Sequence, residues 1–111
     1  AVEINNDKFN CFVSVTCEFT KFDNPNRETA GEHLYWNKNG GSIALITTTR
    51  QIFVSVGVSF NLTLENYLFS IGSDSYTSMA EALRLTKIDP SISNSDQRRL
   101  VFFIGDQAMK L

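Results

Sequence analysis

The stretch that decides the predicted fold is FNCFVSVTCEF, residues 9–19 of the 111-residue chain. Apolar residues and cysteines occupy its odd positions, and all but one of its even positions are polar. Alternation with a period of two is typical of a β-strand that buries one face. The sequence therefore predicts one long strand over residues 9–19.

Both cysteines of the chain, Cys11 and Cys17, lie on the face of this strand that is predicted to be buried. At about 3.3 Å per residue, their Cα atoms would lie ~20 Å apart, far beyond the ~7 Å limit for a disulfide. A hairpin at residues 13–16 would bring them together, but two valines without Gly, Asn or Pro make a poor turn. We expect two buried free thiols, with a Cys11–Cys17 disulfide as the alternative.

Outside this stretch, the polar segment at residues 23–32 contains Pro and Gly and predicts a loop. The Asn-Gly pair at residues 39–40 lies between two apolar runs, which is the strongest short-range signal for a β-hairpin. Alternation or continuous apolar runs predict further strands over residues 33–36, 42–49, 51–60, 67–72 and 100–104.

One helix is predicted, between the last two of these strands. Ser78 and Glu81 have the spacing of an N-terminal capping box, and Pro90 disfavours helical geometry at Asp89. We therefore expect a helix that starts near Ser78, ends near Ile88 and packs on one face of a sheet. The predicted fold is a single α+β domain over residues 1–111, with a mainly antiparallel sheet of about five to six strands.

The composition excludes two classes of partner. A formal net charge of −2 leaves no basic stripe for DNA or RNA, so we expect no nucleic-acid binding. No apolar run approaches the roughly 20 residues that cross a bilayer, so we expect no direct membrane insertion of this segment.

Side chains that could carry chemistry are few. His33 is the single histidine, and its neighbour Glu32 would point to the opposite face of a strand, so the two would form no dyad. Two cysteines and one histidine supply too few soft ligands for a closed zinc site. The sequence therefore predicts no catalytic, cofactor-binding or metal-binding residue, no cofactor and no enzymatic activity.

Residues 67–107 resemble the periplasmic domain of the ExbD/TolR energy-transducing proteins. The shared order is a strand ending at Gly72, a helix containing Met79–Leu83, and a strand, Leu100–Ile104, that closes on Asp106. This resemblance implies an extracytoplasmic, periplasmic setting, in line with a chain that begins at Ala1 rather than Met. Free cysteines point instead to the cytoplasm.

Long alternating strands offer edges on which another protein can add a strand. We therefore expect a non-catalytic protein–protein interaction domain that binds another protein or self-associates. It could be the soluble region of a membrane-anchored regulator, or an inhibitor or immunity-type protein. One alternative is a carrier that binds a small apolar ligand in a Phe-lined cavity. Another is an enzyme whose site is assembled by a partner or a homodimer.

Overall fold

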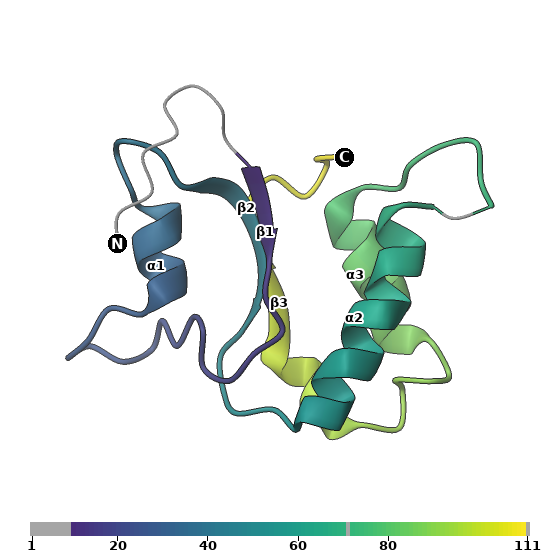
Figure 1. The fold of residues 1–111 in the computed structure, drawn as a ribbon, viewed down its shortest axis with the longest axis horizontal. Coiled ribbons are helices and arrows are strands. Elements are labelled where there is room, and N and C mark those ends of the chain that lie inside the picture. Colours follow the sequence, from purple (N-terminus) through teal and green to yellow (C-terminus); the bar gives the residue numbers. More distant parts are fainter. Residues whose placement is uncertain (1–9, 71, 111) are drawn as a thin grey trace.

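The computed structural model describes residues 10–70 and 72–110. Its centre is a sheet made of β1 (Asn10–Val13), β2 (Ser42–Thr48) and β3 (Val101–Ile104), in the order β1-β2-β3. β1 runs parallel to β2, whereas β3 runs antiparallel to it. Figure 1 shows this mixed sheet nearly edge-on, between helices on both sides.

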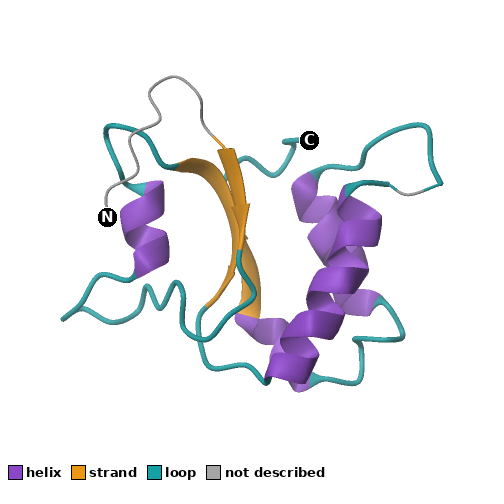
Figure 2. Ribbon diagram, in the orientation of Figure 1, coloured by secondary structure: helices purple, strands orange, loops and turns teal. Residues whose placement is uncertain are grey.

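The helices cover the two faces unequally. α1 (Ala30–Tyr35) lies on one side, and α2 (Val54–Leu68) and α3 (Met79–Ile88) lie together on the other (Figures 1 and 2). A short 3₁₀ helix, η1 (Asp96–Leu100), leads directly into β3. None of the helices in the described part of the chain is long and apolar enough to cross a membrane.

The predicted sheet of five to six mainly antiparallel strands is wrong. The described residues form three strands in one mixed sheet and three α-helices, so of the predicted fold class only the mixture of helix and strand is confirmed. The predicted strands at residues 42–49 and 100–104 correspond to β2 and β3. The other predicted strands are replaced, wholly or mostly, by helices and turns.

The largest difference concerns residues 51–60 and 67–72, which belong mostly to α2 and the turn after it. Ile71 lies outside the described residues. The buried residues of α2 recur every three or four positions, which is the spacing of one helical face; they are Gly57, Phe60, Leu64 and Leu68. The period-two pattern exists as well, but its valines at positions 54 and 58 are exposed. The segment fits both a strand pattern and a helix pattern, and the residues that are buried follow the helical spacing.

The predicted hairpin around residues 37–41 is a connection between α1 and β2. Gly41 has a φ of +93°, and a Cβ there would lie 2.0 Å from the carbonyl oxygen of Leu34. The glycine therefore lets the chain turn back closely against the helix that it has just left. Asn-Gly marks a turn as expected, but the segment before it is helical.

α1 itself begins inside the predicted loop at residues 23–32. The backbone N–H and the hydroxyl of Thr29 both donate to the Glu32 carboxylate, at 2.7 and 2.8 Å. This contact is the Glu half of a capping box, and it stabilises the start of the helix. α3 begins as predicted, because the Ser78 hydroxyl accepts from the backbone N–H of Glu81 at 3.2 Å.

Most of the apolar core lies between the sheet and the pair α2 and α3. It contains Val15, Ala44, Ile46, Ile52, Phe60, Leu64, Leu68, Met79, Ala82, Leu83, Ile92 and Val101. Burial of a side chain such as Phe60 or Leu64 contributes about 1.5–3 kcal/mol. The α1 side is held differently, by a hydroxyl pair between Thr20 and Thr47 at 3.0 Å and by the close approach of Gly31 to Thr20.

Candidate functional site

The predicted long strand over residues 9–19 is wrong beyond Val13, where β1 ends. Its first residue, Phe9, lies outside the described residues. After Val13 the chain leaves the sheet and turns over residues 16–20, which we call the Cys17 turn. This turn stands at the carboxyl end of β1.

Hydrogen bonds to the β2 strand frame the turn on both sides. Before it, the backbone N–H of Ser14 donates to the carbonyl oxygen of Ile46 at 2.8 Å. After it, the N–H of Thr20 donates to the carbonyl oxygen of Thr48 at 2.9 Å. The chain therefore returns to β2 almost where it left, and the residues between these two bonds project from the strand end.

Glu18, in the middle of the turn, has a φ of +50°. A positive φ is uncommon for a residue other than glycine, and such conformations cluster at functional sites. The backbone N–H of Glu18 donates to the carbonyl oxygen of Arg50 at 3.2 Å, and its carboxylate pairs with Lys21 at 3.5 Å. These contacts hold the unusual conformation and fix the direction of the preceding residue, Cys17.

Cys17 is exposed rather than buried, so that part of the sequence prediction is wrong. Its thiol donates to the carbonyl oxygen of Ile52 at 3.4 Å. Its backbone N–H has no hydrogen-bond partner among residues 10–70 and 72–110. The Ile52 carbonyl comes just before Phe53, the N-cap of α2, so the thiol lies close to a helix end that favours negative charge.

Cys11 has a different environment on β1. It is half-buried and packs against the apolar core, and its thiol donates to the sulfur of Met109 at 3.4 Å. Burial raises the pKa of the Cys11 thiol above its ordinary value, which lowers the fraction of reactive thiolate. Both cysteines are free, as predicted, although the long strand on which that prediction depended does not exist.

An ion pair connects the segment after β2 with the polar loop that follows the Cys17 turn. Arg50, whose carbonyl accepts from Glu18, donates from Nη1 to Asp23 at 3.0 Å and makes a second contact through Nη2. The Arg50 guanidinium holds the pKa of the Asp23 carboxyl below its usual range. Because both side chains are exposed, we regard this pair as a positioning contact rather than a source of stability.

The single histidine does not reach the thiol. His33 lies on α1 with an exposed side chain, and its Nδ1 is 3.4 Å from a carboxylate oxygen of Glu28. The prediction that Glu32 and His33 point to opposite faces of a strand fails because both lie in a helix, where Glu32 caps the first turn. Among the described residues, no imidazole contacts the Cys17 thiol.

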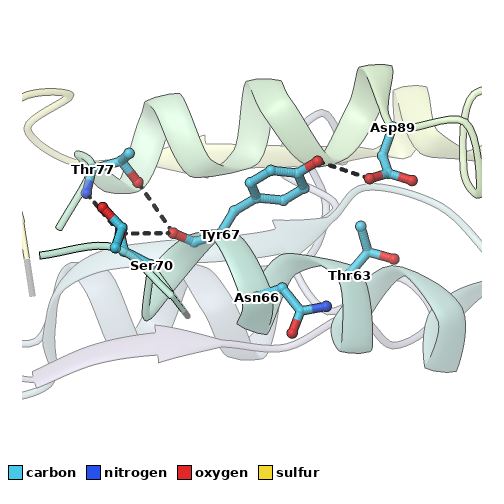
Figure 3. Close-up of a pocket in the computed structure, with 7 residues that line it drawn as sticks. Thr63, Asn66, Tyr67, Ser70, Thr77 and Asp89 are labelled. Carbon is cyan, nitrogen blue, oxygen red and sulfur yellow. Dashed lines mark hydrogen bonds between the residues drawn. The ribbon is translucent and has the colours of Figure 1, made fainter. Parts of the chain in front are cut away.

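Apart from the Cys17 turn, a hollow lies between α2 and the end of α3 (Figure 3). It has a volume of about 370 Å³ and is lined by Thr63, Asn66, Tyr67, Ser70, Ser73, Thr77 and Asp89. The Tyr67 hydroxyl donates to Asp89 at 2.8 Å, which raises the pKa of the tyrosine. None of the described residues that line this hollow carries a thiol, imidazole or amine, so these residues supply no strong nucleophile or base at neutral pH.

In the part of the chain that the structure describes, no group of three or more His, Cys, Asp or Glu side chains is placed to hold a metal ion. The chemistry that the described residues offer is therefore that of an exposed thiol at a strand end. The alternating pattern gave no signal for this strand end, because it continues through Glu18 and Phe19, whereas β1 ends at Val13.

The model of Peptidase family C25 matches residues 2–111, nearly the entire chain. No curated protein and no solved structure matches it. The family match overturns the predictions of a non-catalytic interaction domain, of an apolar-ligand carrier and of a protein that is not an enzyme. It also replaces the resemblance to the ExbD/TolR proteins, whose first strand corresponds here to the end of α2 and the turn after it.

Proposed function

The chain belongs to peptidase family C25, and we propose that it carries the nucleophile of a cysteine peptidase, with Cys17 in that role. In such an enzyme a thiolate attacks the carbonyl carbon of a peptide bond, forms a thioester and releases the amine, and water then hydrolyses the thioester. The observation that carries the assignment is the exposed thiol of Cys17 at the carboxyl end of β1.

The position of Cys17 in the sheet supports this role. Ligands of α/β sheets bind where parallel strands end, outside their carboxyl ends. The carboxyl ends of the parallel strands β1 and β2 lie at the same end of the molecule as the amino end of α2 (Figure 1). The thiol of Cys17 therefore lies where a substrate bound outside this end of the sheet would meet it.

Cys11 is a poor alternative nucleophile. Its thiol is half-buried among core side chains and directed at Met109, and burial raises its pKa. A substrate would have to displace the packing on β1 to reach it. The two cysteines therefore serve as candidate and internal control in one chain.

The backbone N–H of Cys17 supplies a second part of the proposed mechanism. This group has no acceptor among the described residues, and it belongs to the attacking residue itself. During attack, the carbonyl oxygen of the substrate becomes an oxyanion close to the nucleophile, where a free N–H stabilises the developing charge. We assign this N–H to the oxyanion hole.

Cysteine peptidases also need a base that removes the thiol proton. His33 is the one histidine of the sequence, and it contacts Glu28 rather than Cys17. We propose that the base comes from outside the described residues, from a partner chain or another part of the protein. This corresponds to the sequence-based alternative of an enzyme whose site is assembled by a partner.

Apolar side chains next to the thiol provide a surface for substrate. Phe53 is 71% exposed and Val54 is 81% exposed, and they follow directly after Ile52, whose carbonyl accepts from Cys17. Exposed large apolar side chains beside a reactive group are suited to binding a substrate side chain. We propose that Phe53 packs against an apolar part of the peptide substrate.

The experiment that tests the proposal is labelling with a peptidyl chloromethyl ketone, a peptide-like reagent that alkylates the nucleophile of a cysteine peptidase. Mass spectrometry of digested protein should locate the adduct on Cys17. The Cys11→Ala variant should be labelled as well as the parent, whereas Cys17→Ala should lose peptide hydrolysis by roughly 10³-fold or more in the intact protein.

The His33→Ala variant is the matched test of the base. We expect its labelling and its turnover to remain close to those of the parent, because His33 does not contact the thiol. An adduct on Cys11, or hydrolysis that persists in Cys17→Ala, would refute the assignment of the nucleophile.

A further inference from the structure

An aromatic groove lies on the α1 side of the sheet, away from the Cys17 thiol contacts. It has a volume of about 340 Å³ and is lined by Thr20, Phe22, Glu32, Tyr35, Trp36, Phe102 and Ile104. Its walls come from α1 and its C-cap, from the last residue of the Cys17 turn and the loop after it, and from β3. Pockets that hold small molecules have volumes of about 300–1,000 Å³, so the groove is large enough for a small ligand.

Two pairs of aromatic rings line this groove. Phe22 and Phe102 have ring centroids 5.3 Å apart with an interplanar angle of 71°. Tyr35 and Trp36 have centroids 5.1 Å apart with an interplanar angle of 82°. In each pair one ring meets the other edge-to-face, so the groove is lined by ring faces in different orientations.

Two of these rings are unusually exposed for side chains of their size. Trp36 is 74% exposed and Phe22 is 56% exposed. Clustered aromatic surface that remains in water marks a binding site. The faces of aromatic rings carry a negative electrostatic potential, and tryptophan attracts cations most strongly.

A carboxylate provides charge of the matching sign. Glu32 lines the groove, and one of its oxygens, Oε2, accepts both hydrogen bonds from Thr29. The other oxygen, Oε1, has no donor among the described residues. Among residues 10–70 and 72–110, no Lys or Arg lines the groove, so none of them neutralises the Glu32 carboxylate from within it.

The same lining selects among cations. A primary ammonium brings three N–H donors, and each needs an acceptor when it leaves water. Besides Glu32, the groove offers mainly ring faces and the hydroxyls of Tyr35 and Thr20, and the Thr20 hydroxyl is already paired with Thr47. A quaternary ammonium has no N–H donor to satisfy, and its charge is spread over methyl groups that pack against rings.

From these observations we propose that the aromatic groove binds a quaternary ammonium group. The rings supply cation–π contacts, and Glu32 supplies the counter-charge. This proposal is independent of the role of Cys17, because no groove residue contacts the thiol.

Trp36 makes the proposal measurable, because it is the single tryptophan of the sequence and lines the groove. Choline chloride should change its fluorescence in a saturable way when it is titrated against sodium chloride at equal ionic strength. The uncharged isostere 3,3-dimethyl-1-butanol should bind at least about tenfold more weakly. If choline and the uncharged isostere bind equally well, the groove is merely apolar and the proposal is overturned. If the fluorescence shows no saturable change, the groove is not a binding site for either compound.

Matched variants test the named contacts. Glu32→Gln keeps the cap of α1, since glutamine also suits that position of a capping box, and should weaken choline binding about fivefold or more. Glu28→Gln, a nearby acid outside the groove, should leave binding unchanged. Phe22→Leu should weaken binding, whereas Phe69→Leu, an exposed aromatic on the other side of the sheet, should not.

Thermal unfolding of each variant separates lost binding from lost structure. If Glu32→Gln unfolds at the temperature of the parent and still binds choline equally well, the assigned counter-charge is wrong. If Glu32→Gln is destabilised, Phe22→Leu decides, because Phe22 lies in an exposed loop position.

Discussion

Cys11 and Cys17 come from one short stretch of sequence, but their surroundings differ in almost every respect. Cys11 lies on a strand that is packed against the core. Its thiol donates a hydrogen bond to the sulfur of Met109, and burial raises the pKa of this thiol. Cys17 lies in an exposed turn, close to the amino end of α2. Because the residue type is the same, we expect any difference in their reactivity to follow from where β1 ends.

The turn that follows β1 is held by a neighbouring element, α1. Gly31 of α1 lies so close that a Cβ on it would be 1.7 Å from the hydroxyl oxygen of Thr20, the last residue of the Cys17 turn. The N–H of Gly31 also donates to the carbonyl oxygen of Phe19 at 3.0 Å. α1 therefore clamps the turn that presents Cys17, whereas no such clamp acts on Cys11.

The largest effect is expected from breaking this clamp. Gly31→Ala should lower the free energy of unfolding by about 2–3 kcal/mol, because the added methyl overlaps Thr20 and forces the turn to move. Urea denaturation followed by circular dichroism measures the loss. Labelling of Cys17 should slow in the same variant, while alkylation of Cys11 stays unchanged.

Gly72→Ala is the control for this substitution. A Cβ at Gly72 would meet no atom within 4 Å, and its φ of +84° leaves only backbone strain. We expect a loss of about 1 kcal/mol and no change at either thiol. Equal losses in the two variants would show that packing against Thr20 is unimportant.

A smaller effect is expected in the reactivity of the native thiols. Iodoacetamide should alkylate Cys17 at least about tenfold faster than Cys11, because Cys11 is partly buried and this burial raises its pKa. Quantitative mass spectrometry of the two cysteine-containing peptides gives both rates in one sample. In denaturant the two rates should converge, and equal rates in the native protein would contradict the contrast drawn between the two sites.

The smallest effect is a dependence of stability on pH. Burial raises the pKa of Cys11 above its ordinary value of 9.0, so the unfolded chain loses this proton first as the pH rises. The folded state then holds more protons than the unfolded state, and stability falls with increasing pH. The contribution of Cys11 to the free energy of unfolding is therefore fully present when the pH is below the ordinary pKa of 9.0. It is lost as the pH rises through the pKa of the folded state.

Urea denaturation at about pH 8 and about pH 10 measures this effect. The fall in stability between the two conditions should be smaller in Cys11→Ala than in the parent. Tyr67 also has a raised pKa, so the difference between parent and variant, rather than the total fall, is the informative quantity. An identical fall in both proteins would mean that the folded environment does not perturb Cys11.

The candidate site could have been recognised only in part from the sequence. The sequence showed that Cys17 is one of only two thiols, but the alternating pattern continues to Phe19 and hid both the end of β1 at Val13 and the positive φ of Glu18. The Ile52 carbonyl and the amino end of α2 come from a distant segment that sequence patterns predicted to be a strand. No local rule brings that segment to the thiol.

Local chemistry was sufficient where one strong signal acted without a competitor. Ser78 caps the start of α3, and the ring of Pro90 disfavours helical geometry just beyond its end. Continuous apolar runs marked β2 and β3. The sequence alone also determined that the chain has only two thiols and one imidazole from which to build chemistry.

Packing decided the remainder. Residues 51–60 satisfy both a strand pattern and a helix pattern, and only the sheet face that needed covering selected the helix. The same holds for Cys17, which is exposed in a turn that is anchored to β2 through Thr20 and to α1 through Phe19. Periodicity describes which residues share a face, but the tertiary structure determines which face is buried and where a strand must stop.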